Sequence, residues 1–202
     1  MTNQVKWSVT SGPAEDVLTL EEAKAQLVVE TDDDDVLIQA FIDSATEWAQ
    51  EYTGVKFINQ SVTYTMDCLP ASNGQVELPS HNASAVTAIS YVDSEDATQS
   101  DVLSDYYIDT QSMSVRVKPI SGWPSIRTTG YNNFTVVVTE GFGSASSDVP
   151  KPIKQAISMM VAHFYRNREA VVVGTIASDM PLSSKALLDK YRVLYRKDYG
   201  DM

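Results

Sequence analysis

The residues best suited to catalysis in this sequence of 202 residues are one cysteine and two histidines. Cys68 could act as a nucleophile with His163 as its base, because such partners need only lie close together in the fold. The residues around Cys68 give no sign of an activated thiol, and His163 falls inside a predicted helix, where packing or interface roles are more common. His81 follows Pro79 in a polar loop and is predicted to be a solvated turn residue. These residues predict no nucleophilic active site.

The most acidic stretch, residues 31–35, is a second candidate for chemistry, as a cation site. A calcium loop of the EF-hand type needs oxygen ligands spread along the segment, a glycine at its sixth position and a closing glutamate. Counted from Asp32, Val36 is fifth and Leu37 is sixth, so the pattern fails. We expect instead that these carboxylates cap the following helix, whose dipole favours negative charge at its start.

Motifs for other cofactors and reactions are missing from the sequence. It contains no Gly-x-x-x-x-Gly-Lys-Ser/Thr, no Gly-x-Gly-x-x-Gly and no Gly-x-Ser-x-Gly. A single cysteine excludes an internal disulfide and a cysteine-based metal knuckle. Carboxylates are so numerous that a chance pair carries no glycosidase signal. We expect no metal, no cofactor and no enzymatic activity.

The charge is strongly acidic and unevenly placed. Net charge is −12, of which residues 14–53 carry −11, residues 54–150 carry −6 and residues 151–202 carry +4. Tight non-specific binding to duplex DNA depends on Lys and Arg, so this chain is a poor candidate for it. The asymmetry predicts that an acidic N-terminal part meets a basic C-terminal part, within a subunit or between neighbours. Solubility alone is the other explanation of the acidity.

The hydropathy of the sequence indicates in which environment the chain folds. At 43% hydrophobic residues it can bury a core. No apolar run approaches the roughly 20 residues that cross a bilayer, and the first residues lack the apolar centre of a signal peptide. We expect a soluble protein with no membrane partner, made and used in a reducing compartment.

Helical periodicity marks both ends of the sequence. Residues 20–27 follow a capping box formed by Thr19 and Glu22. Residues 34–53 carry a broad apolar stripe that ends at Gly54. The longest well-marked helix lies within residues 147–170, with Asp148 as its expected cap. A last helix is expected after a Ser183-Ser184 cap.

Between these helices the period changes from 3.6 to 2. The expected strands lie in residues 57–66, 75–78, 86–92, 106–108, 113–117 and 134–139. Trp123, between Gly122 and Pro124, is the aromatic residue most expected to be exposed. The pattern predicts an α+β fold, an α-helical core of about four helices with an inserted small antiparallel β-sandwich or barrel. The predicted parts are an N-terminal arm (1–17), a helical core (18–54 and 147–202) and the β-module (55–146).

The order of several stretches is similar to one family. They are Leu18-Thr19-Leu20-Glu21-Glu22-Ala23-Lys24, then Asp34-Asp35-Val36-Leu37-Ile38 with residues 45–54, then Asp148-Val149-Pro150-Lys151-Pro152-Ile153 with His163-Phe164-Tyr165-Arg166-Asn167-Arg168-Glu169-Ala170. Together they resemble the head–tail connector (adaptor) proteins of tailed bacteriophages and related gene transfer particles. No single stretch is diagnostic, whereas their order is specific.

The resemblance implies a structural, non-enzymatic protein of the neck of a virion or phage-like particle, made in the bacterial host cytoplasm. Members of the family form a ring of about twelve copies beneath the portal protein. The ring extends the DNA channel and gives the downstream neck or tail-completion protein a platform, and DNA passes through it without sequence-specific binding. The resemblance also implies that the C-terminal segment, residues 182–202, grips the portal.

Two sets of residues follow as hypotheses. A closed ring needs two different, complementary faces on each subunit. For the subunit interface we expect the acids Glu47 and Glu51 to meet the end of the long helix of a neighbour, with its His163, Arg166 and Arg168. For portal docking we expect the basic and aromatic residues of the last segment: Tyr191, Arg192, Tyr195, Arg196 and Lys197.

Two other functions remain open from the sequence. The chain could be a monomeric binding module whose β-domain recognises a polysaccharide or a protein. It could also be a hydrolase with a site that the sequence does not reveal, for example one that brings Cys68 to His163.

Overall fold

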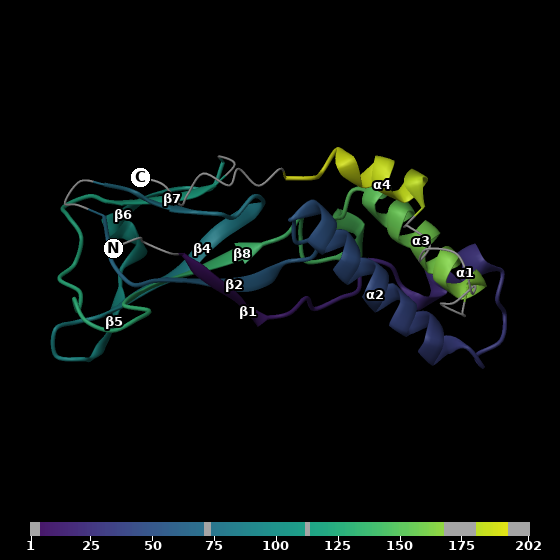
Figure 1. The fold of residues 1–202 in the computed structure, drawn as a ribbon, viewed down its shortest axis with the longest axis horizontal. Coiled ribbons are helices and arrows are strands. Elements are labelled where there is room, and N and C mark those ends of the chain that lie inside the picture. The colour runs from purple at the N-terminus through teal and green to yellow at the C-terminus, as the bar shows by residue number, and fades with distance from the viewer. Residues whose placement is uncertain (1–4, 71–73, 112–113, 168–180, 194–202) are drawn as a thin grey trace, which may run out of the picture. The chain divides into compact units, whose positions relative to one another are not determined.

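A computed structural model describes residues 5–70, 74–111, 114–167 and 181–193 (Figure 1). The chain forms two compact units. The β unit comprises the described residues of Met1–Pro13 and Asn59–Gly141, and the helical unit comprises Ala14–Ile58 with the described residues of Phe142–Leu194. The predicted α+β class, with four α-helices and antiparallel sheets in the described residues, is confirmed.

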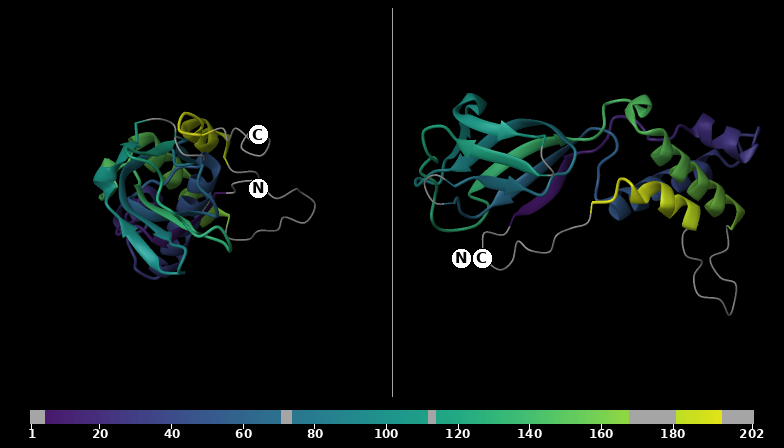
Figure 2. Two further views of the ribbon diagram at one scale, coloured as in Figure 1. Left: turned by 90° about the vertical axis from the view of Figure 1, so that its left-hand side faces the viewer. Right: turned by 90° about the horizontal axis from the view of Figure 1, so that it is seen from above.

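Two antiparallel sheets make up the β unit and pack face to face (Figure 2). The larger has the order β1-β2-β8-β4-β5, formed by Lys6–Ser11, Gln60–Met66, Phe134–Glu140, Ala83–Val92 and Thr98–Asp101. The smaller has the order β3-β7-β6, formed by Val76–Leu78, Val115–Pro119 and Tyr106–Asp109. The module is therefore a sandwich of two sheets and not a closed barrel.

Alternation of side chains explains the core of the β unit. Along β2 and β8 every second residue is buried, as a strand with one face against a second sheet requires. The register pairs Val62 with Val138 on one side of β8 and Val86 with Val138 on the other. β8 thus places Phe134, Val136 and Val138 in the apolar core between the sheets.

The N-terminal arm predicted for residues 1–17 is wrong where the chain forms β1. Lys6–Ser11 pairs antiparallel with β2, from Lys6 opposite Thr65 to Ser11 opposite Ser61. All six of its residues are exposed, because β1 is an edge strand outside the sandwich core. Its backbone hydrogen bonds, rather than burial of its side chains, hold it to the sheet.

Four helices form the helical unit: α1 (Leu20–Leu27), α2 (Asp35–Thr53), α3 (Lys151–Arg166) and α4 (Leu182–Asp189). The predicted capping box is confirmed, since the amide of Glu22 donates to Thr19 Oγ1 at 3.2 Å and the amide of Thr19 donates to Glu22 Oε2 at 3.0 Å. Gly54 ends α2 in the left-handed conformation, at φ 72°, as predicted.

Three other predicted caps are wrong. Asp34 occupies the N-cap position of α2 but makes no side-chain cap, because it instead accepts a hydrogen bond from the Tyr165 hydroxyl. Asp148 lies in a 3-10 turn before α3 and accepts from the Ala145 amide, and Pro150 takes the N-cap position. Pro181 precedes α4, where Ser184 is a buried residue inside the helix.

Apolar faces of the helices share one core. It contains Ile38 and Ile42 of α2 with Ile153, Ile157 and Met160 of α3, all fully buried or nearly so. These positions recur at three- and four-residue steps, so each helix turns one face inward and leaves the other to solvent. In the described residues, no helix has the length and apolarity that a membrane span requires.

Candidate subunit and docking surfaces

The outward face of α2 is an acidic stripe. Asp43, Glu47 and Glu51 follow one another at four-residue steps, and all three are exposed. Ala45 and Ala49, on the other side of the helix, are fully buried and fix this orientation. Glu47 and Glu51 form no hydrogen bond or ion pair with any other described residue. The predicted acidic half of the subunit interface is therefore exposed and free to bind.

The C-terminal end of α3 carries the predicted basic half. Arg166 is exposed and forms no ion pair within the described part of the chain. His163 is half-buried, with its Nδ1 3.3 Å from the amide nitrogen of Asn167 and its ring against Phe164. Arg168 lies outside the described residues. Basic side chains in this last turn also complement the helix dipole.

A tyrosine fixes how these two halves are placed in one subunit. The Tyr165 hydroxyl donates to Asp34 at 2.6 Å, so the end of α3 lies against the start of α2. Glu47 lies thirteen residues further along α2, which is about 20 Å at 1.5 Å per residue. Arg166 and Glu47 therefore face outward at well-separated places on the helical unit, as an interface between two different faces requires.

The end of α4 packs on the end of α2 through an aromatic residue. The Tyr52 hydroxyl donates to Asp189 at 2.6 Å, and this hydrogen bond, followed by desolvation, raises the pKa of Tyr52. The guanidinium of Arg192 lies 4.8 Å from the Tyr52 ring centre, within the range of a cation–π contact. The Trp48 ring stacks on the Tyr52 ring, at 5.0 Å between ring centres.

The backbone completes this attachment, because the Val193 amide donates to the Thr53 carbonyl at 2.8 Å. The chain therefore reaches the C-terminal segment from a fixed point beside the end of α2. Of the predicted docking residues, Tyr191 contacts Phe142 edge-on and Arg192 remains exposed above Tyr52. Tyr195, Arg196 and Lys197 lie outside the described residues.

Side chains of the helical unit itself hold the acidic run before α2. Lys24 Nζ lies 2.6 Å from Asp32 and 2.8 Å from Asp35, and its hydrogen bond lowers the pKa of Asp32. Asp34 accepts from Tyr165 as described above. No group of three potential metal ligands occurs among the described residues.

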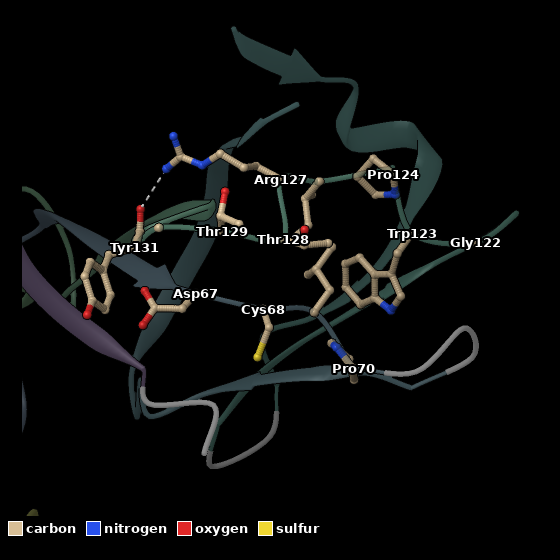
Figure 3. Close-up of a pocket in the computed structure, with 13 residues that line it drawn as sticks. Asp67, Cys68, Pro70, Gly122, Trp123, Pro124, Arg127, Thr128, Thr129 and Tyr131 are labelled. Carbon is tan, nitrogen blue, oxygen red and sulfur yellow. Dashed lines mark hydrogen bonds between the residues drawn. The ribbon is translucent and has the colours of Figure 1, made fainter. Parts of the chain in front are cut away.

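An open pocket of about 1090 Å³ lies at one edge of the β unit (Figure 3). Cys68, Leu69 and Pro70 line one side, and the loop from Gly122 to Tyr131 lines the other. The Arg127 guanidinium in this loop is already bound, to Asp96 at 2.8 Å and to Asn133 at 2.8 Å. The lining is mostly apolar and suits a packing contact better than acid–base chemistry.

The prediction that Trp123 is exposed is wrong. Its indole Nε1 donates to the Gly74 carbonyl at 3.1 Å, and its ring packs against Tyr106 and edge-on against Phe134. These contacts leave Trp123 half-buried, packed against the core of the β unit. Burial also raises the pKa of Tyr106, and its hydrogen bond to Asp101 adds to that rise.

The pair Cys68 and His163, considered from the sequence, falls in different units. Cys68 lines the β-unit pocket, whereas His163 contacts Asn167 and Phe164 within the helical unit. His81 is half-buried in the loop before β4.

Comparison with protein families matches the Phage gp6-like head-tail connector protein model over residues 17–121, just over half of the 202 residues. The chain belongs to this family. The predicted resemblance to head–tail connectors is therefore confirmed. No curated protein matches the sequence.

Solved structures from gene transfer agent particles share the fold of this connector. A chain from the "Neck of empty GTA particle computed with C6 symmetry" superposes with a TM-score of 0.76 at 18% identity. A chain from the "Neck of native GTA particle computed with C12 symmetry" gives 0.74 at 19% identity, and one from the "Virion of native gene transfer agent (GTA) particle" gives 0.73 at 18%. Each match covers 94% of this chain and 96% of the other.

Some residues that organise the connector's candidate surfaces were not singled out from the sequence. Tyr52 and Tyr165 each donate a hydrogen bond to a carboxylate more than 100 positions away. Helical spacing places Tyr52 in the apolar stripe of residues 34–53. Nothing in the neighbouring sequence distinguishes a tyrosine that only packs from one whose hydroxyl also donates a hydrogen bond. Of the acidic partners, Asp189 carries no separate signal, and Asp34 was expected to cap α2 rather than to bind a tyrosine.

Proposed function

We propose that this connector is a structural, non-enzymatic protein that assembles as a homo-oligomeric ring in the neck of a phage or phage-like particle. The ring lies beneath the portal, continues the DNA channel and provides a platform for the next neck or tail protein. The observation that carries the proposal is the match of fold over 94% of the chain to chains from gene transfer agent necks solved with C6 and C12 symmetry.

Charge placement supports a ring with two unlike faces. Glu47 and Glu51 of the acidic stripe on α2 are exposed, and so is Arg166 at the end of α3, beside the half-buried His163. The two sets lie at different places on the helical unit. We propose that the stripe of one subunit contacts the α3 end of its neighbour. Arg168 belongs to the proposed contact by its position in the sequence.

Portal docking is assigned to α4 and the segment that follows it. Arg192 is exposed at the anchored end of α4, where Val193 is bonded to Thr53. The segment continues with Tyr195, Arg196 and Lys197, whose positive charge suits an acidic partner surface. The chain as a whole is acidic, with a net charge of −12, and this suits a channel wall to which passing DNA does not adhere.

The test is the mass of the purified chain, alone and with the portal protein of its own particle, by size exclusion with light scattering. We expect a ring-sized species or capture by the portal ring. A monomer that ignores the portal at all concentrations would contradict the proposal. It would favour the second candidate, a binding module that uses the apolar β-unit pocket.

A further inference from the structure

The loop between α1 and α2 presents the two most exposed large apolar side chains among the described residues. Val28 is 85% exposed where α1 ends, and Val36 is 87% exposed in the first turn of α2. Apolar side chains this exposed at both ends of one short loop gain nothing from the fold of the subunit itself. Neither valine belongs to the apolar core of the helical unit or packs against it.

Val28 is also in a backbone conformation that disfavours it. It has φ 59° and ψ 44°, the left-handed region, and it ends α1 in a double hydrogen-bonded cap: its own amide donates to Ala25 and the next amide donates to Lys24. Glycine is the usual residue at this position, because a β-branched side chain clashes there. Within the described part of the chain, the other non-glycine residues with positive φ are Asp96 and Asn132, of the types that tolerate it. Retaining a valine here thus works against the helix end.

Three contacts hold the loop in one shape. Lys24 binds Asp32 at 2.6 Å and Asp35 at 2.8 Å, and Tyr165 binds Asp34 at 2.6 Å. The loop is therefore preorganised, which lowers the entropy lost when a surface binds it. Figure 1 shows that α1 and the start of α2 lie at the same end of the helical unit.

The charged residues around the two valines limit the kind of molecule that can bind there. Glu30 and Asp33 are exposed and form no hydrogen bond or ion pair with the described residues, so the apolar spots have an acidic rim. Like charge opposes pairing of this loop with the same loop of a second copy. A nucleic acid is opposed for the same reason.

We infer that this loop, residues 28–36, docks a different protein of the neck, through a surface with shallow apolar pockets flanked by Lys or Arg. The inference rests on the proposed function, because it assumes that the ring has axial neighbours. It adds a third contact, distinct from the ring interface and from the C-terminal segment. Val28 and Val36 are its apolar anchors, and Glu30 with Asp33 forms its rim.

The substitution Val28→Gly tests the docking role of the loop without lowering the stability of the fold. The change removes the anchor and relieves the strained cap, so the thermal midpoint should stay the same or rise. We expect at least a ten-fold loss of affinity for one of two probes, the purified portal protein or the purified tail-side neck protein of the same particle. Val36→Ser should lower the affinity for the same probe. The double change Glu30→Lys with Asp33→Lys should also lower that affinity, most strongly at low salt.

Val102→Ser is the matched control, because Val102 is 60% exposed on the β unit and should change no affinity. Wild-type affinity of both valine variants for both probes would overturn the inference, as would a wild-type chain that forms rings yet binds neither probe. If a valine variant instead changed the size of the assembly that the chain forms with itself, the loop would contact a second copy of this chain. That result would overturn the assignment to another protein. Absence of both rings and probe binding would contradict the proposed function itself.

Discussion

In the β unit, three of the four described basic side chains are bound to carboxylates of the same unit: Lys6 to Asp67, Arg116 to Asp109 and Arg127 to Asp96. In the helical unit, Lys24 and Lys154 are similarly bound. Arg166, Lys151 and Lys185 there form no ion pair with another described residue, and the stripe of α2 leaves its acids unpaired. The β unit uses charge to fix its own turns, whereas the helical unit keeps charge available for other molecules.

Each unit buries a core of its own, formed by helices in one and by sheets in the other. The substitution with the largest expected effect tests whether these two cores unfold independently. Ile157→Ala empties a fully buried position of the helical core, and we expect a loss of about 2–5 kcal/mol in the free energy of unfolding. Hydrogen exchange should show weaker protection of amides in α2 and α3, with β8 unchanged.

Phe134→Ala is the matched change in the β unit, where a fully buried ring is lost at a cost of about 3–5 kcal/mol. Protection should fall in β2 and β4 and stay in α3. An equal fall across both units in either variant would mean that the two cores unfold together.

Gly141 directly follows β8, and its substitution should have the next largest effect on stability. It has φ 152°, and a Cβ there would lie 2.5 Å from the backbone nitrogen of Asn59. We expect Gly141→Ala to destabilise the β unit by about 1–3 kcal/mol, measured by chemical denaturation. Gly12→Ala is the control, because no atom lies within 4 Å of its added Cβ. Equal stability of the two variants would contradict the close approach at Asn59.

The turn between β4 and β5 offers a smaller test of how the β unit uses charge. Asp93 accepts from the Gln99 side chain and from the Ala97 and Glu95 amides, and these bonds lower the pKa of Asp93. Because its folded pKa is lowered, Asp93 stabilises the turn above its ordinary value of about 3.9, and this contribution is lost as pH falls through the folded pKa. A carboxyl titration followed by NMR should give a midpoint below the ordinary value. Gln99→Ala should raise that midpoint, and an unchanged one would refute the assignment.

Tyr52 provides the corresponding test in the helical unit, with the smallest expected effect. Its bond to Asp189 stabilises the neutral phenol, so ionisation followed by ultraviolet absorbance should occur above the ordinary pKa of about 10. Asp189→Asn should lower the midpoint for Tyr52. The same midpoint in both proteins would mean that Asp189 does not control this contact.

Much of the fold follows from local patterns. The capping box at Thr19, the glycine stop at Gly54 and the alternation along β2 and β8 each depend on neighbouring residues, so sequence reasoning finds them. The strand β5, Thr98-Gln99-Ser100-Asp101, has little β-propensity and exists because β4 lies beside it. β1 alternates Trp7 and Val9 with polar residues, but Gly12 and Pro13 follow directly and are typical of a loop.

The surfaces were less predictable, for a physical reason. Arg166 and Glu47 could be chosen because charge is visible in sequence, but their separation on one subunit depends on Tyr165 binding Asp34 across 131 positions. The unusual position of Val28 depends on a backbone angle that its own sequence disfavours. Residues that serve a partner molecule need not satisfy local rules, so local rules do not identify them.

The central claim is that unlike charged faces of the helical unit close the ring, and a charge swap tests it most directly. Assembly mass would be measured with the portal protein present for Arg166→Glu, for Glu47→Lys with Glu51→Lys, and for all three changes together. We predict that the first two variants lose the ring at physiological salt, that the combined variant regains it, and that a charge reversal on the β unit, Lys118→Glu at an exposed position of β7, keeps it. Wild-type assembly by both the Arg166 and the Glu47–Glu51 variants would contradict the account.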